Sequence, residues 1–465
     1  MLFNSVEFLY FLPLIVFLFY VLRPNFRIYL LIAASFYFYM SWNPLYLLLM
    51  LTTTFTNFFA GILISRFFSK IHRKIILFGS LIINFGLLFY FKYSNFIIEN
   101  LNTLFIKFKI EHQPIEFLDI ILPIGISFYT FHTISYTLDV YKNKIQPERN
   151  VFTFILYVSF FPLLVAGPIE RFSALMPQFK EKAILSRENF SIGLRMILYG
   201  FFLKMVVADN LSILVDQSYA NISTTSSINL LLTLFLYSFQ IYCDFNGYTT
   251  IALGIAKLFN INLTQNFKTP YFSQSLTTFW RKWHITLTTW FRDYIYYPLG
   301  GNRTTLTKWI LSTLLVFFIS GFWHGANWTF VLWGVLHGMI IIIEKLTGFD
   351  KKSKSLFINI LKGGIVFIVV SCLWVLFRSP SIEVATLFFE NLFHNFRLSY
   401  ELPSIETVVI LMIFICFDFL TRHSNFGTWL NDKSIYFRWG IYFLLGFLIM
   451  SQSGTDMQPF IYFQF

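Results

Sequence analysis

Residues 307–345 read TKWILSTLLVFFISGFWHGANWTFVLWGVLHGMIIIIEK and form two apolar runs, 307–322 and 326–345, with His324 between them. A helix that crosses a bilayer needs about 20 predominantly apolar residues. The second run reaches that length, whereas the first stops at GFWHG and is expected to be tilted or re-entrant. Ionisable groups inside a membrane protein are costly and are usually functional. The segment therefore predicts a helical membrane protein with a functional site around His324.

The composition of the whole chain agrees with a membrane protein. Hydrophobic residues make up 56% of the 465 residues and charged residues 12%, whereas a soluble domain has about 25% charged residues. The formal net charge of +12 comes from basic residues in short loops between apolar runs. The positive-inside rule explains this pattern better than nucleic-acid binding does. The three cysteines are far apart and no close histidine pair occurs, so no metal site is expected.

Thirteen apolar runs are candidates for membrane helices, and several of them are shorter than a full span. They cover residues 6–22, 28–45, 46–65, 75–93, 118–140, 151–167, 191–209, 228–246, 307–322, 326–345, 356–377, 405–420 and 436–452. We therefore expect an all-α polytopic protein with about eleven transmembrane helices plus re-entrant and amphipathic helices. The whole chain, 1–465, is expected to be one membrane-embedded domain. No internal repeat is apparent, which disfavours an inverted-repeat transporter.

The stretch 260–303 is too polar for lipid and too aromatic for a solvated loop. It contains FWRKWH (279–284) and WFRDYIYYPLGGNR (290–303), in which large apolar residues recur every three or four positions. This spacing predicts an amphipathic helix that ends at the Pro-Leu-Gly-Gly sequence. Basic side chains place the stretch at the cytoplasmic face by the positive-inside rule. They are Arg281, Lys282, Arg292 and Arg303.

His284 and His324, each next to a tryptophan, are the residues best suited to proton transfer. Acyl transfer needs a base for the attacking hydroxyl, and imidazole titrates near neutral pH. From the residues alone, His324 could instead be a buried structural histidine bonded to a neighbouring helix, and His284 could be an interface histidine that anchors an amphipathic helix. His337, in WGVLHG (333–338), would lie roughly 20 Å along a continuous helix from His324. Helix packing is the favoured role for His337, with lining of the same tunnel as the alternative.

A set of ordered motifs resembles the membrane-bound O-acyltransferase family. The motifs are LPIGISF (122–128), FPLLVAGPI (161–169), QIYCDFNGY (240–248) and the histidine segments 279–303 and 321–325. The resemblance covers roughly residues 120–340 and is strongest to the bacterial branch that acetylates alginate and peptidoglycan, with the D-alanyl transferase of teichoic acids as a cousin. It implies helices around a central tunnel and a cytoplasmic acyl thioester donor. Acetyl-CoA is the expected donor, and no bound cofactor is expected.

The resemblance also implies roles for three residues. His324 matches the signature histidine of the family and is expected to be the general base. His284 matches a position where other branches have asparagine, so we expect it to position the thioester carbonyl or the acyl group. Anchoring of the amphipathic helix is the alternative for His284. The chain ends in FIYFQF (460–465), and Tyr462 matches a tyrosine implicated as an acyl relay, with an interfacial aromatic anchor as the alternative.

The remaining candidates are expected to bind the donor or to line the tunnel. They are Arg281, Trp283, Arg292, Asp293, Trp323, Asp244 and His337. Asp244 lies in an apolar run, so its carboxylate should be protonated or paired, either with Arg281 or Arg292 or with a histidine that it orients. Thr250 stands where the family often has a second aspartate. Arg292 is expected either to pair with Asp293 or to meet the phosphates of the donor.

Together these features predict a membrane-bound O-acyltransferase of the bacterial plasma membrane. It would move an acyl group, expected to be acetyl, from the cytoplasmic thioester through acyl-Tyr462 to an extracytoplasmic esterase-like partner. That partner would acylate a cell-wall or exported polysaccharide, with alginate, peptidoglycan and other glycans as candidates. Direct transfer onto a glycan or lipid hydroxyl is one alternative. A polysaccharide transporter is another, although a transporter should carry midplane charges and broken repeats.

Overall fold

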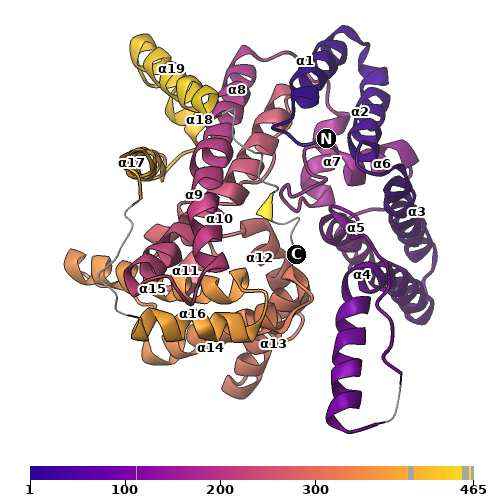
Figure 1. Ribbon diagram of the computed structural model, residues 1–465. Coiled ribbons are helices and arrows are strands. Elements are labelled where there is room, and N and C mark those ends of the chain that lie inside the picture. Colours follow the sequence, from indigo (N-terminus) through magenta and orange to yellow (C-terminus); the bar gives the residue numbers. More distant parts are fainter. Residues whose placement is uncertain (111–112, 396–402, 453–459, 462–465) are drawn as a thin grey trace. The chain divides into compact units, whose positions relative to one another are not determined.

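The computed structural model describes residues 1–110, 113–395, 403–452 and 460–461, and all regular secondary structure in these residues is helical (Figure 1). Within this part of the chain, seven helices are long and apolar enough to cross a membrane. They are Pro44–Arg66, Lys70–Lys107, Arg187–Ala220, Ser227–Leu258, Leu306–His324, Trp328–Thr347 and Leu356–Arg378. Shorter apolar helices, including Val6–Val21 and Ile435–Ser451, accompany them. The prediction of an all-α polytopic membrane protein is confirmed.

One unit of the chain contains residues 1–187 and 256–263. Its helices are α1 (Val6–Val21), α2 (Pro24–Met40), α3 (Pro44–Arg66), α4 (Lys70–Lys107), α5 (Ile126–Tyr141), α6 (Val151–Ser159) and α7 (Phe172–Lys180). A buried polar chain joins three of them, because Asn57 of α3 donates to Asn84 of α4 at 2.9 Å and accepts from Thr137 of α5 at 2.7 Å. Hydrogen bonds of this kind help membrane helices to associate.

The other unit contains residues 188–255 and 264–465, and its described part holds the candidate histidines. Its first elements are α8 (Arg187–Phe201), the π-helix η1 (Phe202–Ala208), α9 (Asp209–Ala220), α10 (Ser227–Leu258), the 3-10 helix η2 (Pro270–Phe272), α11 (Leu276–Trp280), α12 (Ile285–Phe291) and the π-helix η3 (Arg292–Tyr296). The later ones are α13 (Leu306–His324), α14 (Trp328–Thr347), α15 (Leu356–Arg378), α16 (Ile382–His394), α17 (Ile405–Leu420), α18 (Phe426–Trp429) and α19 (Ile435–Ser451).

Two glycines allow α13 and α14 to pack backbone against backbone. A Cβ atom at Gly321 would lie 2.2 Å from the carbonyl oxygen of Phe330, and one at Gly334 would lie 2.2 Å from that of Phe317. No side chain fits at such distances, and small residues at membrane helix interfaces serve this purpose. The contact brings the end of α13, which carries His324, against the first half of α14.

A second close approach joins α8 and α10. A Cβ atom at Gly200 would lie 2.8 Å from the carbonyl oxygen of Gly247, and one at Gly247 would lie 3.0 Å from the backbone nitrogen of Lys204. Lys204 belongs to the π-helix η1, an element that is often found at functional sites. The packing therefore sets Lys204 beside the middle of α10.

Three parts of the chain differ from the expectation or extend it. The run 307–322 is not cut short, because α13 continues to His324 and is long enough to span. The run 151–167 forms only the nine-residue α6 followed by turns. The amphipathic helix predicted within 260–303 is broken between α11 and α12, although Phe279 and Trp290 of its apolar face are buried as expected. The single domain and the central tunnel stay predictions.

Candidate active site

His284 and His324 lie together in the interior of the second unit. Their ring centroids are 6.5 Å apart, and their side chains are 0% and 3% exposed. The indole of Trp323 contacts both rings, at 6.2 Å from His284 and 5.0 Å from His324. His324 is the last residue of α13, and His284 immediately precedes α12. The fold thus brings together the two histidines that the sequence singled out.

Asn266 clamps the backbone around His284. Its main-chain oxygen accepts the N–H of Ile285 at 2.9 Å, and its Oδ1 accepts the N–H and the hydroxyl of Thr286 at 3.1 and 2.7 Å. His284 itself has a φ of +42°, a left-handed conformation that is strained for a non-glycine residue. The clamp offsets this strain and breaks the expected amphipathic helix. Burial lowers the pKa of His284 to about 3, so the imidazole is neutral at neutral pH.

Aromatic side chains of α14 and α15 surround His324. The rings of Trp333 and Phe377 lie 5.2 and 5.3 Å from its centroid. Trp333 also contacts His337 at 4.8 Å, so one indole separates the two histidines. Trp280 donates its indole N–H to His337 Nδ1 at 3.3 Å, which makes Nε2 the protonated nitrogen of a neutral ring. His337 is therefore near the pair without contacting the same atoms.

Trp280 also lines a cavity of about 730 Å³. The cavity has aromatic and aliphatic walls with three basic side chains among them, a mixture that suits an elongated ligand with apolar and anionic parts. Its lining includes Thr277, Trp280, Arg281, Leu287, Thr288, Phe291, Arg292, Tyr296, Tyr297, Trp309, Phe317, Ser320 and Lys345. Because Trp280 contacts the ring of His337 at 5.1 Å, one wall of the cavity adjoins the histidine cluster, by which we mean His284, His324 and His337.

The predicted donor-binding residues take different positions. Arg281 and Arg292 both line the cavity. Arg292 Nε also pairs with Asp293 Oδ1 at 2.9 Å, so both alternatives for Arg292 are compatible with the structure. Trp283 is 1% exposed and packs against Phe279 at 5.5 Å, which makes it part of the apolar core under α11.

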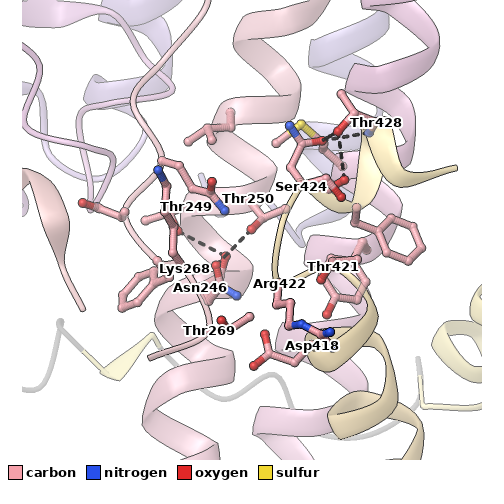
Figure 2. A pocket seen from close by; sticks show the side chains of 18 of the residues that line it. Asn246, Thr249, Thr250, Lys268, Thr269, Asp418, Thr421, Arg422, Ser424 and Thr428 are labelled. Carbon is pink, nitrogen blue, oxygen red and sulfur yellow. Dashed lines mark hydrogen bonds between the residues drawn. The ribbon is translucent and has the colours of Figure 1, made fainter. Parts of the chain in front are cut away.

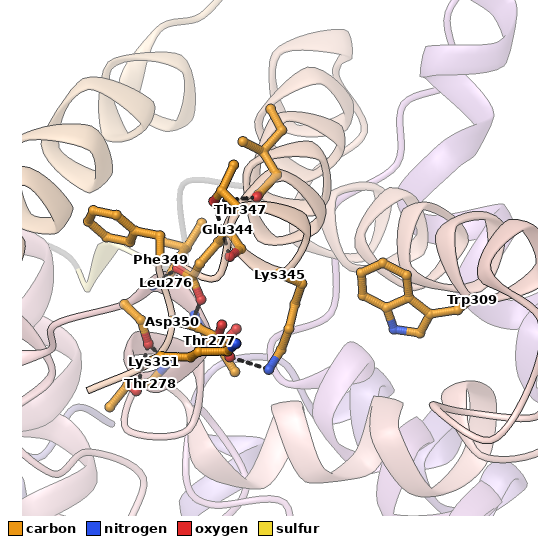
Figure 3. A network of polar contacts seen from close by, with 12 residues as sticks. Leu276, Thr277, Thr278, Trp309, Glu344, Lys345, Thr347, Phe349, Asp350 and Lys351 are labelled. Carbon is orange, nitrogen blue, oxygen red and sulfur yellow. Dashed lines mark hydrogen bonds and ion pairs between the residues drawn. The ribbon is translucent and has the colours of Figure 1, made fainter. Parts of the chain in front are cut away.

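A buried carboxylate positions the segment that carries Arg281 (Figure 3). Glu344 of α14 accepts the backbone N–H of Leu276 and, at 3.2 Å, that of Thr277. These two donors belong to the first turn of α11 and would otherwise lack a partner within the helix. The next residue, Lys345, lines the cavity and pairs with Asp350. Two adjacent residues of α14 therefore have different tasks: Glu344 binds the first turn of α11, and Lys345 contributes a cation to the cavity lining.

Asp244 belongs to a buried ion network that includes two residues missed in the sequence. Lys204 Nζ donates to Asp244 Oδ1 and to Asp209 Oδ1, both at 2.7 Å. The expectation that Asp244 pairs with Arg281 or Arg292 was therefore wrong. The physical reason is the glycine-mediated approach of α8 and α10, which places the ammonium of η1 beside α10.

Asp244 also holds the C-terminal segment. Its Oδ2 accepts the backbone N–H of Ile461 at 2.9 Å. The preceding residue, Phe460, packs on Phe245 at 5.8 Å. The ring of Phe245 is at the same time 4.7 Å from the ring of His284. The predicted relay residue, Tyr462, follows Ile461 in the sequence and lies outside the described residues.

Comparisons with known proteins identify the family of the chain. Residues 148–376 match the membrane-bound O-acyltransferase family. A probable alginate O-acetylase of Pseudomonas putida is 34% identical over 492 aligned positions, which cover all of both chains. The peptidoglycan O-acetyltransferase of Helicobacter pylori is 36% identical over 79% of this chain and 73% of its own. The teichoic acid D-alanyltransferase of Bacillus subtilis is 26% identical over 52% of this chain and 62% of its own.

The full-length similarity at 34% identity, the helical membrane fold and the buried histidine pair are mutually consistent. The family match spans His284, His324 and the residues that line the cavity. The chain belongs to the membrane-bound O-acyltransferase family and is a membrane-bound O-acyltransferase.

Proposed function

We propose that this protein takes an acetyl group from cytoplasmic acetyl-CoA and passes it through Tyr462 to an extracytoplasmic esterase-like partner, which acetylates a polysaccharide. The observation that carries the proposal is a buried pair of histidines, His284 and His324, beside His337, whose neighbour Trp280 lines a cavity with three basic side chains. The names of the alginate and peptidoglycan O-acetyltransferases support a polysaccharide as the final acceptor. The protein would act in the plasma membrane of a bacterium, where donor and acceptor are on opposite sides.

The cavity lined by Arg281, Arg292 and Lys345 is the proposed seat of the donor. A coenzyme A thioester carries phosphates, which basic side chains recognise, and a long arm that needs an apolar channel. Trp280 stands where this cavity adjoins the histidine cluster. The thioester end of the donor would thus enter beside His337, and Trp333, which contacts both His337 and His324, lies on the way to His324.

His324 is the proposed base, and Tyr462 is the proposed nucleophile. His324 takes the proton of the phenol, the phenolate oxygen attacks the thioester carbonyl, a C–O bond forms and the C–S bond breaks. The thiolate leaves and takes the proton back from His324. His284, which is neutral because burial lowers its pKa, donates an N–H to the carbonyl oxygen where negative charge develops.

The anchoring of Ile461 supports a role for the C-terminus. A solvated interfacial tail would not need a buried aspartate as its backbone acceptor, yet Asp244 supplies one at 2.9 Å. Phe460 packs on Phe245, which itself contacts His284. The chain immediately before Tyr462 is therefore fixed close to the histidine pair.

Release of the coenzyme A thiol by the purified full-length protein tests this proposal. Without the partner, release should stop near one thiol per chain, because the tyrosine is acetylated once. His324→Ala should slow that release by about 10²–10⁴-fold. His394→Ala, which changes an exposed histidine at the end of α16, is the matched control and should leave the rate unchanged. A His324→Ala protein with more than about half of the wild-type rate would contradict the role of the base.

A further inference from the structure

A second cavity, of about 610 Å³, lies in the same unit but is not lined by His284 or His324. It lies among α8, α10, the loop 265–269, α17 and the segment that follows α17. Figure 2 shows hydroxyl, amide and charged side chains from these elements around it. The lining residues that matter for the ligand are Tyr199, Tyr242, Asn266, Phe267, Lys268, Asp418 and Arg422.

Asp418 is a buried carboxylate at this cavity without an ion-pair partner among the described residues. It is 6% exposed and accepts a hydrogen bond from Tyr242 Oη at 2.8 Å. Arg422 lines the same cavity but forms no ion pair with Asp418; its guanidinium donates to the main-chain oxygen of Phe419 at 3.3 Å and lies over the Phe419 ring at 3.9 Å. Lys282 interacts with Asp418 only electrostatically: burial lowers the pKa of Lys282, and the negative charge of Asp418 opposes that shift. A buried carboxylate needs a bonded cation or a proton.

Two buried donors at the cavity also lack hydrogen-bond partners within the described part of the chain. They are Asn266 Nδ2 and the hydroxyl of Tyr199, on side chains of residues that are 1% and 4% exposed. The orientation of the Asn266 amide is fixed, because its Oδ1 accepts the N–H of Thr286. Unmatched donors and an unpaired carboxylate around one cavity of ligand size indicate that a polar molecule completes the site.

The charges identify the ligand class. Lys268 and Arg422 are exposed cations that line the cavity, whereas Asp418 is buried. Tyr242 and Phe267 line it as well, and aromatic rings attract ammonium groups. We propose that this cavity binds a small amino-phosphate of the phosphoethanolamine type, with its ammonium on Asp418 and its phosphate between Lys268 and Arg422.

This ligand chemistry has two sources, a phospholipid headgroup and a soluble phosphoethanolamine. The cavity is lined by α8 and α10, both parts of candidate membrane spans, so that headgroups of the bilayer are available to it. A ligand that accepts from Asn266 Nδ2 holds the same amide that clamps the backbone next to His284. Occupancy of the cavity is therefore linked to the geometry of the histidine pair.

Thermal unfolding of the purified full-length protein tests the proposal. Phosphoethanolamine should raise the unfolding temperature in a concentration-dependent manner, because a ligand that binds the native state stabilises it. Ethanolamine alone and inorganic phosphate alone should bind more weakly. In a second arm, nanodiscs that contain phosphatidylethanolamine are compared with nanodiscs of phosphatidylglycerol. Stabilisation in only one arm identifies the source, and stabilisation in neither arm overturns the proposal.

Three variants separate the site from a general effect. Asp418→Asn, which keeps the size and can still accept from Tyr242, should raise the dissociation constant at least about tenfold, as expected for the loss of a charge-assisted hydrogen bond. Arg422→Ala should weaken the binding of phosphoethanolamine but not that of ethanolamine. Lys352→Ala, an exposed cation outside the cavity lining, is the control and should bind normally. Equal binding by wild type and Asp418→Asn, or phosphate alone binding as tightly as phosphoethanolamine, would overturn the proposal.

Discussion

The Asp244→Asn substitution isolates the anchor between α10 and the C-terminal segment. It removes the charge of the side chain and keeps its size, so an amide N–H₂ must face either the Lys204 ammonium or the N–H of Ile461. Lys204 still has Asp209 at 2.7 Å, so the buried cation keeps one partner. The expected cost is therefore that of one charge-assisted hydrogen bond, about 1.5–3 kcal/mol of unfolding free energy.

Denaturant unfolding in mixed micelles, followed by circular dichroism, measures this cost. The matched control is Asp216→Asn, because Asp216 pairs with Arg378 at 2.6 Å but is 49% exposed. A surface ion pair contributes about 0–1 kcal/mol. The difference in unfolding free energy between Asp244→Asn and Asp216→Asn shows how much more the buried Asp244 contributes than an exposed ion pair.

Asp244→Asn should also impair acetylation of the C-terminus more than its stability loss explains. The reason is that Ile461 loses its acceptor just before Tyr462. Single-turnover release of coenzyme A thiol at a temperature where the variant is fully folded separates the two effects. If Asp244→Asn and Asp216→Asn unfold at the same denaturant concentration and both release thiol at the wild-type rate, Asp244 does not anchor the C-terminal segment.

Further predictions concern helix packing and the two histidines. Gly334→Ala should destabilise the protein by about 1–3 kcal/mol in the same unfolding assay, because its Cβ would lie 2.2 Å from a carbonyl oxygen, whereas Gly364→Ala, which meets nothing within 4 Å, should not. His284→Asn should retain part of the thiol release because an amide still donates to a carbonyl, and His324→Asn should retain none because an amide cannot take a proton; equal loss in both would remove the distinction. Burial lowers the pKa of His284 to about 3, whereas the unfolded chain takes up this proton near pH 6.5. The free energy of unfolding should therefore be unaffected by His284 above about pH 6.5 and should fall between pH 6.5 and pH 3, by at most about 1.4 kcal/mol per pH unit. His284→Asn should flatten the unfolding profile in that window, and an unchanged profile would contradict the buried neutral state.

The helices follow directly from the sequence, because an apolar run of sufficient length has no other stable form in a bilayer. The 326–345 run, for instance, becomes α14 (Trp328–Thr347). The break between α11 and α12, in contrast, could not be predicted from the sequence. The left-handed conformation of His284 goes together with hydrogen bonds that Asn266, which is distant in sequence, accepts from the backbone that follows His284. The periodicity of the apolar residues within 260–303 contains no signal of that contact.

The sequence identified the residues of the candidate site but not the residues with which they form contacts. His324 and His284 stood out by their neighbours and by the family resemblance. The pairing of Asp244 with Lys204 depends on a close approach of two helices, which the spacing within either helix does not encode. A signal was nevertheless present, since Lys204 and Asp209 are charged residues at the end of an apolar run, and charges at membrane depth are usually paired.

Peptide mass spectrometry of the C-terminus after incubation with acetyl-CoA shows directly whether Tyr462 carries the acetyl group. We predict an acetyl group on the Tyr462 peptide of the wild-type protein without any partner, and none on the same peptide of Tyr462→Phe or His324→Ala. The phenylalanine variant keeps the ring and any interfacial anchoring, and it lacks only the nucleophilic oxygen. A Tyr462→Phe protein that acetylates the polysaccharide at the wild-type rate would contradict the relay and leave direct transfer as the mechanism.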